Sequence, residues 1–164
     1  MKFRDLRAEE IEVRVQSVKQ NGLVLLLYKD ARCDMNILDE TVGAENWQRE
    51  HYEVKGNMFC RVGIKCDGEW VWKADCGTES NTEAQKGESS DSFKRSCFCW
   101  GLGRCLYTAP FIWISADKCN IVNGKCYDRF RVAKIAIENK RIVGIRIVNE
   151  SMGDKVAFSW AEDK

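Results

Sequence analysis

The sequence predicts an α+β fold, in which an antiparallel β-β-β sheet packs on a long helix and a β meander follows. Two observations predict this class. Segments of strand length alternate with turn dipeptides such as Asp67-Gly68, and other stretches space their apolar residues three and four apart. With 164 residues the chain has the length of a single domain, with a core expected at 20–115 and a β extension at 116–164.

The first elements are expected to be a helix, a strand and a second helix. Segment 5–18 is charged, has acidic residues near its start and carries scattered apolar residues, which predicts a short amphipathic helix. The continuous apolar run 23–28 predicts a buried strand. A helix over 31–41 is capped by Asp30 and ended by Gly43. Its expected buried face consists of Met35, Leu38 and Val42.

A sheet is predicted next. Segments 48–55 and 58–65 are predicted to be strands. The Asp-Gly dipeptide after them is a strong hairpin signal, and segment 69–74 is predicted to be the second strand of that hairpin. Because side chains alternate along a strand, Trp70 and Trp72 are expected on one face.

The long helix is predicted at 83–100. Residues 77–92 taken alone have the composition of a loop, but helix-forming residues return in their second half. Phe93, Cys97 and Trp100 lie at i, i+4 and i+7, so they are expected on the buried face of this helix. Small residues in its first half would allow a neighbouring backbone to come close.

The C-terminal part reads as a meander. Strands are predicted at 127–137, 140–148 and 156–160. Turn signals at Asn123-Gly124 and Glu138-Asn139 accompany these strands.

Composition limits the function classes. Lys plus Arg number 26 and Asp plus Glu 25, so the net charge of +1 excludes a generally polycationic nucleic-acid coat protein but allows a local basic site. No apolar run approaches the roughly 20 residues that span a membrane. The first ten residues lack the apolar stretch of a signal peptide, so export is not expected.

The nine cysteines are expected to be reduced and mostly buried, because an odd number without a signal peptide argues against a disulfide framework. Zinc is a weaker alternative, since the only close pair is Cys97 and Cys99 and the single histidine is His51. That histidine is expected on the surface.

One enzymatic arrangement is open. Asp39 with Glu53 and Lys55 fits a loose Asp…Glu-x-Lys pattern, in which two carboxylates hold Mg²⁺ and the lysine steadies a scissile phosphate. Polar alternation on a half-exposed strand explains the same residues equally well.

A basic cluster on the long helix is more specific. Lys94 and Arg95 are adjacent and therefore about 100° apart around the helix axis. Lys86 lies two turns earlier near the same face, and Arg104 follows just beyond. Such an edge can hold a row of phosphates. The alternative is a solvated helix face, with ion-pair partners at Glu83, Glu88 and Asp91.

These residues belong to a longer pattern. The run Ser90-Asp91-Ser92-Phe93-Lys94-Arg95 is followed by Trp100-Gly101-Leu102-Gly103-Arg104-Cys105-Leu106. Residues 28–32, 36–47 and 73–78 fit around it in order. Over 23–113 the chain resembles the core of the Rad fifty-two-type single-strand annealing proteins, and is most similar to the short forms of phages and prophages.

The resemblance implies a β-β-β-α core and a ring or ring-like oligomer that anneals complementary DNA strands without ATP. Single-stranded DNA would follow a basic groove, with its backbone held by Lys94 and Arg95. Lys65 lies beside a family position that is linked to a second, outer DNA site. The DNA-binding residues are therefore expected to be Lys94, Arg95, Lys86, Arg104, Lys65, Arg32, Arg61 and Lys73.

A protein of this family is not expected to be an enzyme or to need a cofactor. It is expected to act in homologous recombination and double-strand break repair, in the cytoplasm of a bacterial host. Its expected partners are single-stranded DNA, the complementary strand and further copies of the chain, with a single-strand-binding protein or an exonuclease as candidates. Two alternatives stay open: the Mg²⁺-dependent nuclease, and a strand-protecting protein that hinders annealing.

Overall fold

The computed structural model describes residues 1–78 and 84–163, with the side chains at 84–86 outside the description. The chain divides into two compact units, and each is assembled from separate stretches of sequence. The first consists of Met1–Arg4 and Ala31–Gly103, and the second of Asp5–Asp30 and Arg104–Lys164.

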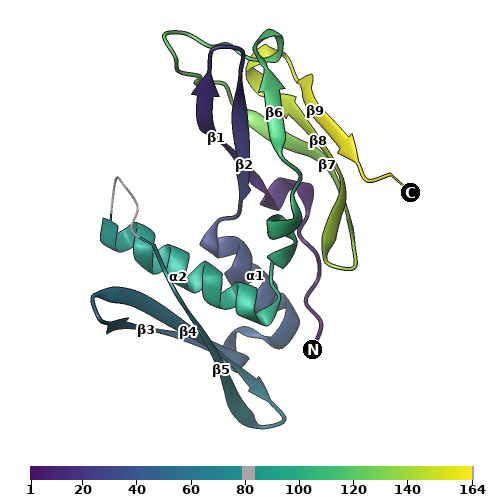
Figure 1. Ribbon diagram of the computed structural model, residues 1–164. Coiled ribbons are helices and arrows are strands. Elements are labelled where there is room, and N and C mark those ends of the chain that lie inside the picture. The colour runs from purple at the N-terminus through teal and green to yellow at the C-terminus, as the bar shows by residue number, and fades with distance from the viewer. Residues whose placement is uncertain (79–83, 164) are drawn as a thin grey trace. The chain divides into compact units, whose positions relative to one another are not determined.

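The first unit is a sheet with helices on one face (Figure 1). β3 (Trp47–Val54), β4 (Asn57–Cys66) and β5 (Glu69–Cys76) form an antiparallel sheet in that order. α2 (Ala84–Trp100) lies across one face of this sheet, and α1 (Ala31–Val42) packs on α2. The predicted α+β class is thereby confirmed, with an antiparallel sheet and two helices in this unit.

Tight turns set the register of this sheet. Lys55-Gly56 joins β3 to β4 and Asp67-Gly68 joins β4 to β5, and all four residues have positive φ, as two-residue hairpins require. One face of β4 then points at α2 and is fully buried. Its residues are Cys60, Val62 and Ile64.

Helix α1 matches its predicted bounds closely, and Gly43, with φ of 86°, ends it. The predicted buried face is only partly right. Leu38 is buried, but Met35 and Val42 are half-buried. The buried residues of this helix instead form two i, i+4 pairs. These pairs are Cys33 with Ile37 and Asp34 with Leu38.

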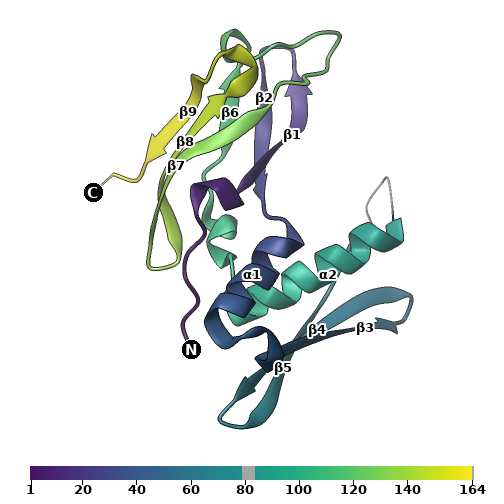
Figure 2. The ribbon, with the colours of Figure 1, turned by 180° about the vertical axis from the view of Figure 1, so that it is seen from behind.

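The second unit contains two antiparallel sheets, whose strand orders are β1-β2-β6 and β7-β8-β9 (Figure 2). The predicted C-terminal meander is confirmed, although its first turn falls at Asn139-Lys140, one residue later than expected, where both residues have positive φ. Because β2 pairs with β6, the predicted core at 20–115 contributes residues to both units. The strands are β1 (Glu12–Lys19), β2 (Gly22–Tyr28), β6 (Ile112–Ser115), β7 (Phe130–Glu138), β8 (Arg141–Asn149) and β9 (Lys155–Ala161).

The predicted helix at 5–18 is wrong. Its acidic start forms only a short 3₁₀ turn at Ala8–Glu10, and Glu12–Lys19 is strand β1. The β-branched residues Val13 and Val15 are half-buried on one face of that strand and pair with the apolar strand β2. This long-range pairing outweighs the local helix signal.

None of the helices in the described part of the chain is long and apolar enough to cross a membrane.

Candidate nucleic-acid interface

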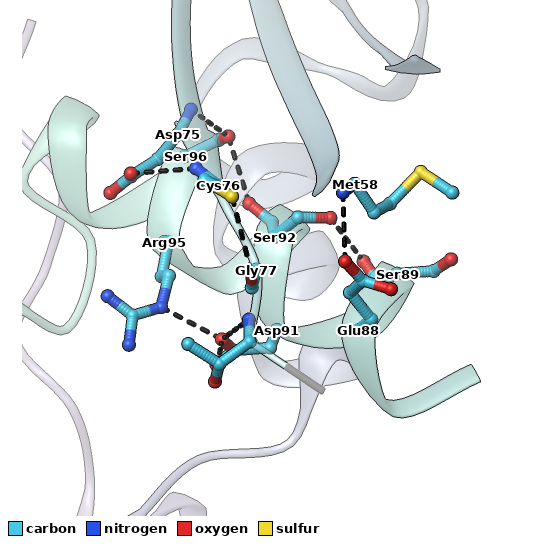
Figure 3. Close-up of polar contacts among 11 residues, drawn as sticks. Met58, Asp75, Cys76, Gly77, Glu88, Ser89, Asp91, Ser92, Arg95 and Ser96 are labelled. Carbon is cyan, nitrogen blue, oxygen red and sulfur yellow. Dashed lines mark hydrogen bonds and ion pairs between the residues drawn. The ribbon is translucent and has the colours of Figure 1, made fainter. Parts of the chain in front are cut away.

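Small residues let helix α2 sit close to the sheet. A Cβ added at Gly77, just after β5, would lie 2.3 Å from the Glu88 carbonyl oxygen, so strand end and helix backbone are in direct contact. Ser96 is fully buried, and its hydroxyl accepts a hydrogen bond from the Asp75 amide at 3.1 Å (Figure 3). The same hydroxyl lies 2.5 Å from the Cys60 carbonyl oxygen. Ser96 therefore joins β4, β5 and α2.

The apolar face of α2 agrees with the prediction. Phe93 and Cys97 are fully buried. Trp100 is half-buried, and its indole Nε1–H donates to the Val62 carbonyl at 2.9 Å. The ring of Trp47 lies 6.1 Å from that of Phe93. These contacts fix the rotation of the helix and hence the direction of its basic edge.

Arg95 is held from one side by a carboxylate. Its Nε–H donates to Asp91 Oδ2 at 2.8 Å, and the same oxygen accepts hydrogen bonds from the Thr78 amide at 3.0 Å and the Thr78 hydroxyl at 3.2 Å (Figure 3). Burial alone would raise the pKa of the Asp91 carboxyl. The hydrogen bonds from Arg95 and Thr78 outweigh burial and hold this pKa below its ordinary value.

Lys94 is the neighbouring cation on α2. It is half-buried, and it has no hydrogen bond or ion pair to any residue that the structure describes. Its ammonium group therefore has no ion-pair partner among the described residues, unlike the guanidinium of Arg95.

The expected ion pair between Asp91 and Arg95 is present. Glu88 serves another purpose, since its carboxylate accepts a hydrogen bond from the Met58 amide at 2.8 Å. Glu83 lies outside the described residues.

Lys73 is bound to the C-terminal end of α2. Its Nζ donates to the Cys99 carbonyl at 3.1 Å and lies 4.7 Å from the centre of the Trp100 ring. A helix C-terminus exposes carbonyl groups that attract a cation. Lys73 thus stabilises the end of the helix on the same face of the sheet.

Arg61 and Lys65 point to the opposite face. Arg61 lies opposite Ala74 and Lys65 opposite Trp70 in the β4–β5 register, whereas the alternate residues of β4 face α2. Arg61 donates to Glu50 at 2.7 Å, and its guanidinium lies 4.5 Å from the centre of the Trp72 ring. Lys65 is exposed. The expected basic set is therefore divided between two faces of one sheet.

The other three expected DNA-binding residues are Arg32, Arg104 and Lys86, and the structure describes no contact of theirs with Lys94 or Arg95. Arg32 is exposed on α1 of the same unit. Arg104 is exposed in a short 3₁₀ helix of the second unit. Lys86 belongs to α2, but its side chain lies outside the description.

The residues of the nuclease pattern are far apart. Asp39 accepts a hydrogen bond from the Trp47 indole at 2.6 Å, at the start of β3. Glu53 lies six positions further along that strand, which is roughly 20 Å at the usual rise of a strand. Within residues 1–78 and 84–163, no group of three or more His, Cys, Asp or Glu side chains is placed to hold a metal ion.

All nine cysteines are free thiols, and five of them are buried: Cys33, Cys60, Cys97, Cys105 and Cys119. His51 is exposed on β3, as expected, and its Nε2 lies 3.0 Å from the Ser89 carbonyl oxygen.

The sequence reasoning missed Arg49. Its guanidinium lies 4.8 Å from the centre of the Phe93 ring, on the side of β3 that faces α2. The signal was the alternation of β3, which places Arg49 on the same face as Trp47. This alternation predicts that Arg49 faces α2 only when the side of the sheet that α2 covers is known.

The first unit presents Lys94 and Arg95 on a helix whose rotation is fixed by buried contacts. The sequence model of the Rad52/22 family double-strand break repair protein matches residues 3–121. A comparison with curated proteins found no match. Because the matched region spans well over half of the chain and includes β3, β4, β5 and α2, the chain belongs to the Rad52/22 family of double-strand break repair proteins.

Proposed function

We propose that this protein binds single-stranded DNA along the basic edge of α2 and anneals complementary strands without ATP or a metal ion. The observation that carries the proposal is the pair Lys94 and Arg95. Both belong to a helix whose rotation is fixed by buried contacts, and the Lys94 ammonium has no partner among the described residues. Cations on a rigid scaffold bind phosphates without sequence preference.

Annealing also requires that the bases stay accessible. A strand-protecting protein stacks bases on exposed aromatic side chains. Phe93 is fully buried and Trp100 half-buried with its indole N–H bonded to the sheet, so these rings support the helix instead. Phosphate contacts on α2 would leave base edges free to meet a second strand.

We infer further that several copies assemble into a ring. One chain with a net charge of +1 offers only a short basic row, which binds a strand weakly. Repetition of that row around a ring would give the DNA backbone a continuous path. Lys65, exposed on the other face of the sheet, is the candidate for a second contact with DNA.

The test is an annealing reaction with two complementary oligonucleotides, in EDTA and without nucleotide. The proposal predicts faster duplex formation with the protein than without it. Slower duplex formation would support strand protection and overturn the proposal. Shortening of the strands that occurs only with Mg²⁺ would support the nuclease.

The site is tested by the double variant Lys94→Ala with Arg95→Ala. A matched control removes one lysine and one arginine from the second unit, Lys134 and Arg146, which are exposed cross-strand neighbours on β7 and β8. The α2 variant should lose affinity for single strands of any sequence, and the slope of log K against log salt should fall by about 0.7 per lost phosphate contact. Equal losses in both double variants would place the DNA elsewhere.

Assembly is tested by light scattering at micromolar concentration. The proposal predicts a mass of several chains, and a strict monomer would overturn the ring. This result is independent of the annealing assay.

A further inference from the structure

We propose that Asp91 is a positioning residue for the DNA contact of Arg95. In this interpretation the carboxylate ties the guanidinium to the end of β5 and so presets it for a phosphate. The inference deepens the proposed function and depends on it.

The geometry joins two parts of the unit, helix α2 and the end of strand β5, at one oxygen. Asp91 Oδ2 accepts the Arg95 Nε–H at 2.8 Å, and also the amide and hydroxyl of Thr78 at 3.0 and 3.2 Å (Figure 3). Asp91 and Arg95 are one turn apart on α2, whereas Thr78 follows strand β5. The arginine is therefore fixed relative to both the helix and the sheet, rather than to the helix alone.

Such fixing matters because an arginine has many rotamers. An unrestrained side chain loses this freedom when it grips a phosphate, and the loss weakens binding. The Arg95 side chain is already restrained in the free protein, although 36% of its surface remains accessible. The bond to Asp91 uses the Nε–H of the guanidinium.

The direction in which DNA affinity changes when the Asp91 carboxylate is removed distinguishes positioning from simple charge repulsion. A carboxylate beside a DNA site repels phosphate, so its removal by itself should strengthen binding. A positioning carboxylate has the opposite effect, because its removal releases the arginine. At Asp91 the loss of repulsion and the loss of positioning change the affinity for DNA in opposite directions, and the loss of positioning is the larger effect.

The experiment compares Asp91→Asn with Glu88→Gln in the full-length protein, with a single-stranded oligonucleotide as the probe. Both variants remove one negative charge from the same helix, and the Gln carbonyl at position 88 can still accept the bond from the Met58 amide. Asp91→Asn should weaken binding by roughly two- to fivefold, the range of a partly exposed helical ion pair with added hydrogen bonds. Glu88→Gln should leave binding unchanged or slightly tighter.

A double-variant cycle separates positioning from general stability. In the Arg95→Ala background, Asp91→Asn should cause no further loss of affinity, whereas loss of helix structure would weaken binding in both backgrounds. Asp91→Glu keeps the charge at the same helical position and should restore part of the affinity. If Asp91→Asn fails to fold, Thr78→Val, which removes only the hydroxyl bond, takes its place and should show a smaller loss.

The outcomes also separate this inference from the proposed function. If Arg95→Ala binds like the wild type, Arg95 is not in the DNA site and the proposed contact fails. If Arg95→Ala weakens binding while Asp91→Asn does not, the DNA site stands and the positioning role is overturned.

Discussion

The β3–β4–β5 sheet has two faces that differ in how they are covered. On the face towards α2, fully buried apolar side chains pack together, and a hydrogen bond from the Ser96 hydroxyl to the Cys60 carbonyl joins helix and strand. On the opposite face, aromatic rings lie side by side, with Trp70 and Trp72 centred 6.2 Å apart and Tyr52 and Phe59 5.7 Å apart. Trp70 remains 39% exposed there. The covered face therefore fixes the orientation of α2 and of its cations, whereas we expect the open face to tolerate change.

The largest expected effect comes from a matched pair of glycines. A Cβ at Gly77 would meet the Glu88 carbonyl oxygen at 2.3 Å, which is backbone that cannot move away. A Cβ at Gly63 would meet the Trp72 ring at 2.8 Å on the open face, and a ring can turn. We expect Gly77→Ala to lower the free energy of unfolding by about 3 kcal/mol and Gly63→Ala by about 1 kcal/mol or less.

Chemical denaturation followed by circular dichroism measures both values. Similar losses for the two glycines would show that α2 does not press on the end of β5 as the contact requires.

The next effect concerns DNA, and compares one lysine and one arginine from each face. Lys94→Ala with Arg95→Ala should weaken single-strand binding about tenfold or more, since two phosphate contacts disappear. Arg61→Ala with Lys65→Ala should weaken it less, because Arg61 is already bonded to Glu50 and stacked on Trp72. Fluorescence anisotropy across a salt series measures both, and a larger loss for the open-face pair would move the main site to that face.

A smaller effect is expected from single polar contacts. Ser96→Ala leaves the half-buried Asp75 amide without the hydrogen bond that it donates to the buried Ser96 hydroxyl, which should destabilise the protein by about 1–2 kcal/mol. On the open face, Glu50→Gln breaks an ion pair whose Arg61 and Glu50 side chains are 43% and 52% exposed, and should change stability by at most about 0.5 kcal/mol. Equal melting-temperature shifts in the two variants would remove the distinction between the faces.

Sequence reasoning succeeded where a local signal decides the structure. Asp67-Gly68 is a hairpin turn because both residues adopt positive φ, which this dipeptide favours. The i, i+4, i+7 spacing of Phe93, Cys97 and Trp100 predicted the second half of α2, and the helix ends at Trp100 as expected. The family motif contains Lys94 and Arg95, so the adjacent cations were visible in the sequence.

The failures required information from distant residues. Glu12–Lys19 is a strand because β2 is available to pair with it, and no local pattern shows this. Which basic residues share a face with α2 depends on which face of the sheet α2 covers. Lys73 lies on the covered face, whereas Arg61 and Lys65 lie on the other. The bond between Asp91 and Thr78 spans 13 positions, so only the i, i+4 partner of Asp91 could be anticipated.

The smallest expected effect concerns the exclusion of water from the covered face at Cys60. Burial raises the pKa of the Cys60 thiol from 9.0 to about 11, against the opposing charge of Arg49 and a hydrogen bond from Ser96. Between these values the folded protein keeps a proton that the unfolded chain has released. The contribution to stability is therefore fully present below pH 9 and is lost as the pH rises towards 11.

The measurement is the free energy of unfolding between pH 8 and 11, for the wild type and for Cys60→Ala. Removal of the thiol lowers stability at every pH, because it leaves a small cavity beside α2. It should also flatten the decline above pH 9, since the variant has no thiol at this position to ionise on unfolding. Parallel curves for the two proteins would mean that water reaches Cys60, and that the covered face is not the dry, rigid support on which the orientation of Lys94 and Arg95 depends.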